Sequence, residues 1–257
     1  MTFEHAFLKV NRSYGGRRWI ARPSDERTAL ALAQGYGLPE LVGRVLSARG
    51  IDLSTADAFL TPKLKSLLPD PSHLKDMDAA ASRIARAIMD GEKVAVFGDY
   101  DVDGATSSAL LRRFFRAAGS DLTVYIPDRI AEGYGPNAPA LLRLKSDGVS
   151  LVVTVDCGVT SFDPLAAAAD AGLEVVVIDH HAAEPRLPRA VAVVNPNRKD
   201  DASPHKTLAA VGVTFLLVVA VNRALREAGW WNDRRPAPEL MNWLDIVALG
   251  TVCDVVP

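Results

Sequence analysis

Short, unbroken runs of apolar residues fill the second part of the chain and are separated by apolar patterns of helical spacing. The apolar runs predict strands at residues 94–97, 122–126, 151–155, 174–178 and 192–194. The helical patterns predict helices at residues 107–118, 136–146, 163–171, 208–228 and 238–249. Buried strands that alternate with helices are typical of parallel sheets. We therefore predict an α/β fold, a parallel sheet of about five strands with helices on both faces.

The apolar pattern before residue 76 differs from that of the second part of the chain. It predicts helices and contains no strand-like run. Residues 28–50 read as helical with an interruption near Gly35, Gly37 and Pro39, and residues 53–60 form a short helix. An amphipathic helix over residues 76–90 leads into the first strand. We predict a small, mainly helical N-terminal segment at residues 1–75 and an α/β domain at residues 76–257.

Acidic and imidazole side chains follow three of the predicted strands. Asp99, Asp101 and Asp103 come after the first strand, Asp156 after the third, and Asp179, His180 and His181 after the fourth. The carboxyl ends of parallel strands share one edge of the sheet, so these groups should converge. One aspartate there would suit a helix N-cap, but three at every second position repel one another unless a cation compensates them. The pattern predicts a metal site.

The types of side chain at this edge narrow the choice of metal. Carboxylates with one or two imidazoles suit Mn²⁺, and Mg²⁺ less well because of the nitrogen ligand. Zinc would recruit more histidine or cysteine. Two cations about 4 Å apart, sharing a carboxylate and a water, would activate that water to attack phosphorus. We expect two divalent cations, with Mn²⁺ preferred.

Composition, charge and cysteines exclude several classes of protein. The 257 residues are 49% hydrophobic and 23% charged, with a net charge of −2, which is typical of soluble globular proteins. The longest apolar stretch, residues 208–221, is too short to cross a membrane, and no signal-peptide pattern is visible. Cys157 and Cys253 form no CxxC pattern. These features predict a cytoplasmic protein with reduced thiols and no membrane partner.

A basic cluster surrounds an aromatic residue near the N-terminus. Arg17, Arg18 and Arg22 flank Trp19. Such a cluster can bind nucleic acid, through phosphate contacts and base stacking. It can also be a segment that packs its tryptophan onto the domain. The sequence leaves both interpretations open.

Three motifs, in this order and at these strand ends, resemble the DHH phosphoesterase superfamily: DYDVDG, VDCG and DHH. Further segments resemble the branch of that superfamily that contains single-strand-specific DNA exonucleases: RWIARP, PDRIAEGYGPN at 127–137, VNPN at 194–197 and LGTVCDVVP at 249–257. The resemblance covers nearly the whole chain. It implies metal-dependent hydrolysis of single-stranded DNA from the 5′ end to mononucleotides, in DNA repair and recombination.

The resemblance also implies roles for particular residues. The metal ligands it implies are Asp99, Asp101, Asp103, Asp156, His180 and Asp254. Among them, Asp156 matches the carboxylate that bridges two cations. His181 is implied to contact the scissile phosphate or act as an acid, and Asp179 to orient a neighbouring imidazole. The loop after the second strand supplies candidates for holding phosphate or a base, namely Arg129, Tyr134 and Gly135.

The chain departs from the family pattern in two places. Phe97 stands where some branches carry a histidine, and Asp99 is the candidate to compensate for it. The chain also stops at Pro257, whereas these exonucleases continue into a second catalytic domain and an oligonucleotide-binding module. We expect a fragment that holds the metals and half of the substrate channel, with weak or no processive digestion.

Two other functions remain open. A relative that hydrolyses small phosphoesters, such as oligoribonucleotides or pAp, would usually begin close to the first strand, unlike this chain. A non-catalytic replication scaffold derived from the superfamily would have lost metal ligands, which this chain keeps. For the exonuclease, the resemblance implies single-stranded DNA as substrate and makes a helicase and a single-strand-binding protein candidate partners.

Overall fold

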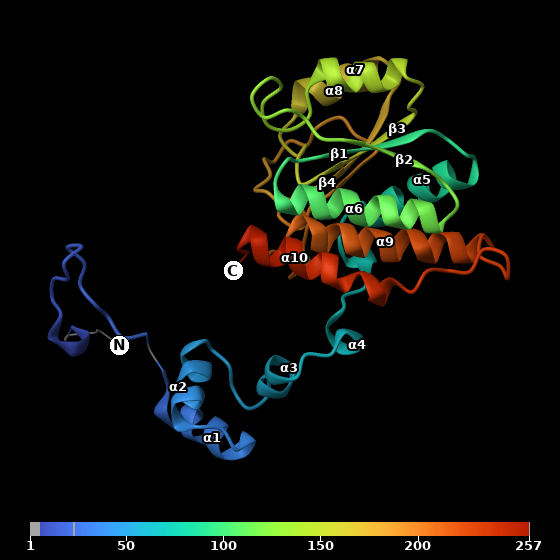
Figure 1. Cartoon of the computed structure of the whole chain (residues 1–257). Coiled ribbons are helices and arrows are strands. Elements are labelled where there is room, and N and C mark those ends of the chain that lie inside the picture. Colours follow the sequence, from blue (N-terminus) through green and yellow to red (C-terminus); the bar gives the residue numbers. More distant parts are fainter. Residues whose placement is uncertain (1–5, 23, 257) are drawn as a thin grey trace. The chain divides into compact units, whose positions relative to one another are not determined.

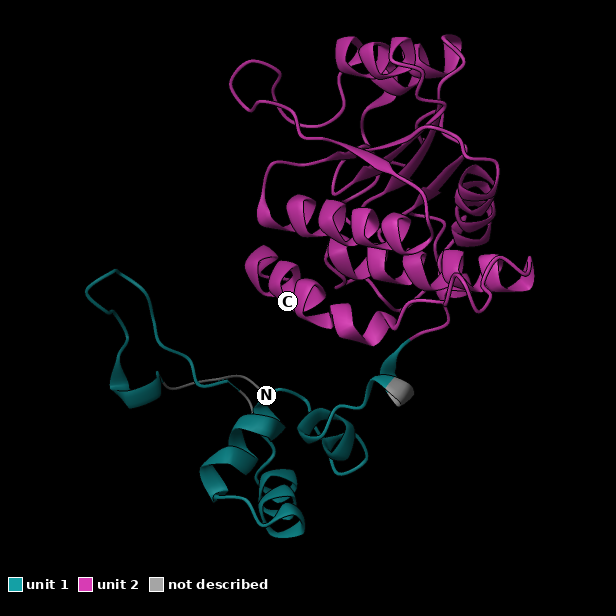
Figure 2. Cartoon of the chain, turned by 45° about the vertical axis from the view of Figure 1, so that its right-hand side comes forward, with its two compact units in different colours: residues 1–68 teal, residues 69–257 magenta. Residues whose placement is uncertain are grey.

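The computed structural model describes residues 6–22 and 24–256, except the side chains of residues 65 and 66. Residues 1–5, Pro23 and Pro257 belong to the predicted segments but lie outside this description. The chain separates into two compact units, residues 1–68 and 69–257 (Figure 2). The stretch 69–75, assigned from the sequence to the N-terminal segment, therefore lies in the second unit.

The first unit is mainly helical. Its helices are α1 (Glu26–Tyr36), α2 (Glu40–Ala48), α3 (Ala56–Leu60), α4 (Leu64–Leu67) and the 3₁₀ turn η1 (Phe7–Lys9). The Asp25 side chain accepts the Thr28 amide at 2.8 Å and starts α1, and Gly37 ends it in the left-handed region, at φ +62°. A small core of Leu32, Leu46 and Ala56 holds α1, α2 and α3 together.

The second unit contains one parallel sheet, as predicted. Its strands are β1 (Val94–Gly98), β2 (Leu122–Tyr125), β3 (Leu151–Val155), β4 (Glu174–Ile178) and β5 (Ala192–Val194). The strand order is β2-β1-β3-β4-β5, and every pairing is parallel. All residues of β1 and β3 are buried, which explains why their sequences read as continuous apolar runs.

Helices cover both faces of the sheet (Figure 1). One face carries α7 (Ala138–Ser146) and α8 (Phe162–Asp170), and the other carries α5 (Met77–Met89), α6 (Val102–Ala117) and α9 (Ala210–Glu227). The last helix, α10 (Leu244–Asp254), packs on α6 and α9 after the 3₁₀ turn η3 (Leu240–Trp243); η2 (Pro71–His73) precedes α5. No helix among the described residues is long and apolar enough to cross a membrane.

The structure corrects two predicted helix boundaries at positions that bear on the site. Helix α6 begins at Val102, not at residue 107, because the Asp101 side chain accepts the Gly104 amide at 3.0 Å and caps the helix. Gly104 is required there, since a Cβ would lie 2.4 Å from the Asp99 carbonyl oxygen. Helix α10 continues past the predicted end at residue 249 and reaches Asp254.

Candidate metal centre

The carboxyl edge of the sheet gathers every predicted metal-binding residue. Their potential ligand atoms form three groups, each within 4.8 Å: Asp99, Asp101 and Asp156; Asp103, His180 and Asp254; and Asp156, His180 and His181. The residues follow the ends of β1, β3 and β4, with Asp103 in the first turn of α6 and Asp254 as the last residue of α10. Asp156 shares one group with Asp99 and Asp101 and another with His180, which itself belongs to the group of Asp103 and Asp254.

Asp156 lies at the centre of this cluster and is fully buried, with 0% exposure. Neither of its carboxylate oxygens has a hydrogen-bond partner. Its backbone adopts φ +62°, a left-handed conformation that costs a non-glycine residue about 1–2 kcal/mol. The hydroxyl of Tyr134 donates to the Asp156 carbonyl oxygen at 3.1 Å and helps to hold it. Strain and unpaired buried oxygens at one residue mark a position built for a ligand.

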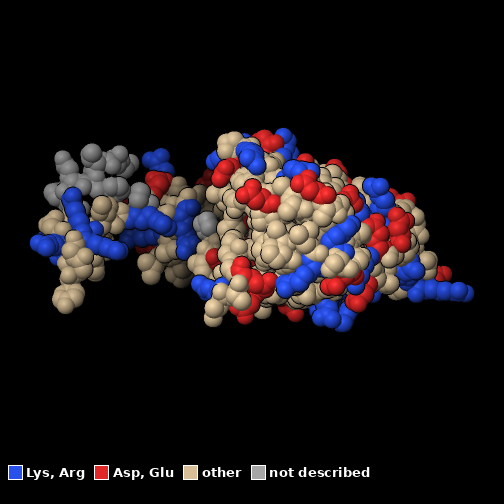
Figure 3. Space-filling view, turned by 90° about the horizontal axis from the view of Figure 1, so that it is seen from above, with Lys and Arg blue, Asp and Glu red and all other residues tan. Residues whose placement is uncertain are grey.

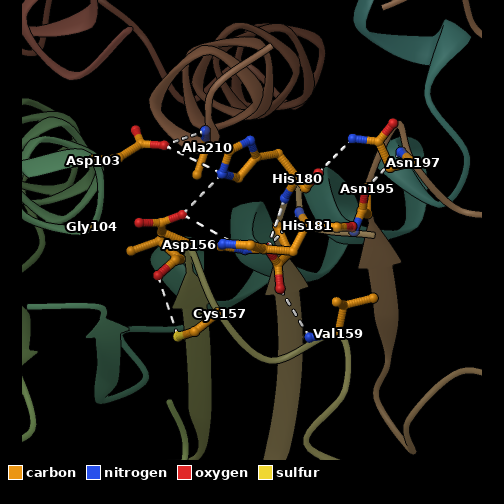
Figure 4. A network of polar contacts seen from close by, with 12 residues as sticks. Asp103, Gly104, Asp156, Cys157, Val159, His180, His181, Asn195, Asn197 and Ala210 are labelled. Atoms are coloured by element: carbon orange, nitrogen blue, oxygen red, sulfur yellow. Dashed lines mark hydrogen bonds and ion pairs between the residues drawn. The ribbon is translucent and has the colours of Figure 1, made fainter. Parts of the chain in front are cut away.

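His180 faces three carboxylates without hydrogen-bonding any of them. Figure 4 shows two of the three, Asp103 and Asp156. Its Nε2 lies 3.3 Å from Asp156 Oδ1 and 3.8 Å from both Asp103 Oδ2 and Asp254 Oδ2. Burial disfavours the charged imidazole, but the interaction with Asp156 outweighs it and raises the pKa of His180. A buried nitrogen surrounded by carboxylate oxygens is a suitable ligand for a divalent cation.

Burial shifts the pKa values of the carboxylates upward. It raises the pKa of Asp156 to about 8, and it also raises the pKa values of Asp99 and Asp103. Asp99 Oδ1 is buried without a partner as well. Without a cation, burial therefore favours the protonated forms of these three carboxylates. Divalent cations would replace those protons and compensate the charge, so the residues present fit the cations that the sequence predicts.

His181 differs from His180 in its surroundings. Its Nδ1 lies 2.7 Å from Asp179 Oδ1, and its side chain is 47% exposed against 12% for His180. The same Asp179 accepts the backbone amides of Val159, His180 and His181. These hydrogen bonds outweigh burial and lower the pKa of Asp179, while the Asp179 contact raises the pKa of His181 to about 9. Because Asp179 binds Nδ1, the Nε2 of His181 is the nitrogen left to act on a substrate.

Asp103 makes contacts that the sequence did not reveal. Its two oxygens accept the amides of Ala210 and Val211, at 2.6 and 2.8 Å, and so cap helix α9 from a distant part of the chain. The N-cap residue Ala209 has no side chain that could do this. The carboxylate of Asp103 is thereby fixed in orientation before any cation binds, and the positive end of α9 lies beside it.

Two asparagines that sequence reasoning left without a role support the histidines. The side-chain amides of Asn195 and Asn197 donate to the carbonyl oxygens of His181 and His180, at 2.9 and 2.5 Å (Figure 4). Both follow β5 at the same edge of the sheet, and this position was the signal available in the sequence.

Gly250 is another residue whose role the sequence did not reveal. A Cβ at this position would lie 2.3 Å from Thr106 Oγ1. Only glycine lets α10 approach α6 closely enough to bring Asp254 into the site.

The loop after β2 reaches the centre through a row of aromatic rings. The Arg129 guanidinium lies 5.2 Å from the Tyr100 ring centroid, Tyr100 meets Tyr134 edge-on at 6.3 Å, and Tyr134 meets His181 at 6.2 Å. Gly135 adopts φ +75° and turns the chain beside Cys157. The structure thus brings Tyr134 to the centre and connects Arg129 to it. Their roles in binding substrate stay predictions.

The basic N-terminal cluster is an ordered loop. The amide of Phe7 donates to the Trp19 carbonyl and the amide of Trp19 donates to the Val10 carbonyl, both at 3.0 Å. Trp19 is 46% exposed, and no side chain in residues 6–22 is buried. On the face that Figure 3 shows, Lys and Arg side chains predominate at the N-terminal loop, whereas both signs of charge are mixed over the second unit. Nucleic-acid binding by this loop stays a prediction.

The fold and the cluster together define a class, an α/β domain with an oxygen-rich candidate metal site at the carboxyl edge of its parallel sheet. Comparison with protein families makes the assignment specific. The model of the DHH family, N-terminal domain, matches residues 93–251. The chain belongs to the DHH family.

The relatives found are single-stranded-DNA-specific exonucleases. The chain is 41% identical over 243 residues to RecJ of Salmonella typhimurium, which covers 94% of this chain and 41% of that protein. It is 36% identical over 241 residues to RecJ of Bacillus subtilis, covering 93% of this chain and 29% of that protein. The chain therefore spans less than half the length of these relatives.

The chain is also similar to solved structures of RecJ. RecJ from Thermus thermophilus in complex with Mn²⁺ is 29% identical, with a TM-score of 0.68, over 93% of this chain and 32% of that chain. Another exonuclease RecJ bound to manganese is 34% identical, with a TM-score of 0.61, over 72% of this chain and 44% of that chain. The Thermus thermophilus protein has also been solved in complex with Mg²⁺.

Proposed function

We propose that this chain is the metal-binding part of an exonuclease that hydrolyses single-stranded DNA from its 5′ end and releases mononucleotides, in DNA repair and recombination. One observation carries the proposal. Asp156 is buried, strained and unpaired between two groups of potential ligands. This arrangement suits a carboxylate shared by two cations, which is a common device for phosphodiester hydrolysis.

The geometry favours a division of the ligands into two sites. Asp99 and Asp101 would hold one cation, and Asp103, His180 and Asp254 the other. Asp156 would be shared, because it groups with Asp99 and Asp101 and its Oδ1 lies 3.3 Å from His180 Nε2. Mn²⁺ is the preferred metal because the set combines several carboxylates with an imidazole, and Mg²⁺ is the alternative. The cations would supply an activated water and neutralise charge on the phosphate.

The remaining residues would position the substrate. His181 is exposed, and its ring is oriented by Asp179, so that Nε2 can contact the scissile phosphate or donate a proton to the leaving oxygen. Tyr134 lies against His181 and is 54% exposed, which suits contact with the terminal base. Arg129 would hold a phosphate near Tyr100 and the turn at Gly135.

The substrate is proposed from the relatives, whose names specify single-stranded DNA. The 5′ polarity is proposed from the family resemblance of the sequence motifs. An enzyme restricted to single strands needs an unwound end, so a helicase and a single-strand-binding protein are the proposed partners. We place the protein in the cytoplasm, where bacterial DNA is repaired.

Digestion of end-labelled single strands in Mn²⁺ tests the proposal. We expect slow, non-processive release of the label as a mononucleotide from a 5′-labelled strand, and no attack on a blunt duplex. Asp156→Asn should abolish the release, while Asp147→Asn, an exposed aspartate after α7, should leave it unchanged. Hydrolysis of dinucleotides alone would favour a small-phosphoester enzyme, and release that persists in Asp156→Asn would contradict the shared-carboxylate role.

A further inference from the structure

A groove runs along helix α6 away from the metal centre. One hollow of about 520 Å³ begins at Tyr100 and Asp101, and a second of about 620 Å³ extends to Arg112, Arg113 and Arg116. The two hollows share three lining residues, Ala105, Ala109 and Ile246. They therefore form one continuous groove, bounded by α6, α10 and the edge strand β2.

The floor of the groove is apolar and exposed. Val124 and Ile126, on and just after β2, are 38% and 40% exposed, and Leu249 of α10 is 55% exposed. Ala105 and Ala109 of α6 also line the groove, and their side chains are too small to fill it. An exposed apolar surface in a concave site is typical of a surface that binds a ligand.

Charge changes sign along the groove. The end at the metal centre carries the Asp101 carboxylate, and the far end carries three arginines of α6, all exposed. The Arg113 guanidinium lies 5.4 Å from the Trp243 ring centroid, which restrains it. Within the described parts of the chain, none of the three arginines forms an ion pair with a carboxylate. A polyanion would complement this end.

Resting on the proposed function, we propose that this groove binds the single strand beyond the nucleotide held at the metal centre. The bases lie over the apolar floor, and the phosphates contact Arg112, Arg113 and Arg116. From Asp101 to Arg116, α6 extends about 22 Å at 1.5 Å per residue, which is enough for several nucleotides. A positively charged groove along the backbone and aromatic side chains that stack on bases are the two components of sequence-independent single-strand binding. Tyr100 supplies an aromatic ring at the near end of the groove.

A simpler interpretation is that the arginines only stabilise the carboxyl end of α6 through the helix dipole. That interpretation predicts a loss of stability on substitution and no change in binding. An acidic protein segment is the other ligand that the three arginines could bind. The experiment below separates both from the proposal.

The test measures fluorescence anisotropy of a labelled 20-nucleotide oligo(dT) in EDTA, with the whole chain. The triple variant Arg112→Ser, Arg113→Ser, Arg116→Ser is compared with a control of equal charge, Lys199→Ser, Arg226→Ser, Arg234→Ser, whose side chains are exposed elsewhere. We expect the groove variant to bind about tenfold or more weakly, with a salt slope smaller by about 2, because each phosphate contact contributes about 0.7. The control should bind within about twofold of the wild type.

Further measurements make each outcome decisive. Ile126→Ser, which keeps the charge, should weaken binding several-fold by removing part of the floor, and circular dichroism checks that all variants fold. Equal binding by the groove variant and the control, or no strand binding by the wild type, would overturn the proposal. Stronger displacement by polyglutamate than by unlabelled oligo(dT) would overturn it in favour of a protein partner. Mn²⁺-dependent release of mononucleotides from a 5′-labelled strand by the wild type reports on the metal centre separately. Its failure, with strand binding in EDTA intact, would count against the proposed function alone.

Discussion

Replacing Gly250 with alanine should disturb one half of the metal centre and spare the other. The new Cβ would lie 2.3 Å from Thr106 Oγ1, 2.8 Å from Val211 Cγ1 and 3.2 Å from Asp103 Oδ1. Relief of these contacts requires α10 to move away from α6 by about 1 Å, and overpacking of this kind costs about 1–3 kcal/mol. Asp254 follows one helical turn later on α10, so it moves with the helix.

A shift of this size matters because ligand distances at metal sites vary by only about 0.2 Å. We expect Mn²⁺ binding that involves Asp254 to weaken by about tenfold or more, while binding at Asp99 and Asp101 remains. Isothermal titration with Mn²⁺ and urea unfolding measure the two effects. Gly35→Ala is the matched control, since its Cβ would make only an ordinary 3.6 Å contact with Leu53. Unchanged Mn²⁺ binding and unchanged stability in Gly250→Ala would refute the reasoning.

Three other predictions concern catalysis, pH and metal. His181→Ala should lower turnover in Mn²⁺ by about 10²–10⁴-fold while bound manganese, measured by elemental analysis, stays the same; an equal loss of metal would make His181 a ligand. Hydrogen bonds from Arg83 lower the pKa of Glu92 below its ordinary value of 4.5, so the stability from this contact is present above pH 4.5 and is lost as the pH falls through the lowered pKa. Urea unfolding between pH 3 and pH 7 should therefore show that the free energy of unfolding falls less toward acid pH in Arg83→Gln than in the wild type. Parallel plots of this free energy against pH would argue against the contact. Mn²⁺ at about 100 times its Kd should raise the free energy of unfolding by about 2.7 kcal/mol per site, and EDTA should reverse the rise in Tm; a Tm that ignores both would count against a metal centre.

The strands were predictable because their physical signal is strong. All five match the predicted ranges to within one residue at each end, since runs such as residues 151–155 and 174–178 are buried on both faces of the sheet. The start of α6 was missed because its first residues include Asp103, Gly104 and Thr106, which read as a turn. The cap at Asp101 and the close approach of Gly104 to Asp99 make that turn helical.

The convergence of the site was predictable from strand ends, but its supports were not. The amides that fix Asp103 come from α9, more than a hundred residues further along the chain. The left-handed backbone of Asp156 and the carbonyl contact from Tyr134 depend on three-dimensional packing. Local sequence patterns do not predict such contacts, because periodicity indicates which face of an element is buried and not which distant group contacts that face.

The central claim, that Asp156 joins two cations in one site, is tested most directly by counting bound manganese. Isothermal titration of the wild type should give two Mn²⁺ per chain. Asp156→Asn is the decisive variant, because asparagine keeps the shape of the side chain and tolerates the left-handed backbone, yet lacks the charge. We predict that it loses high-affinity binding of both ions, while Asp147→Asn retains two. Two ions bound with unchanged affinity in Asp156→Asn, or a single ion in the wild type, would contradict the account.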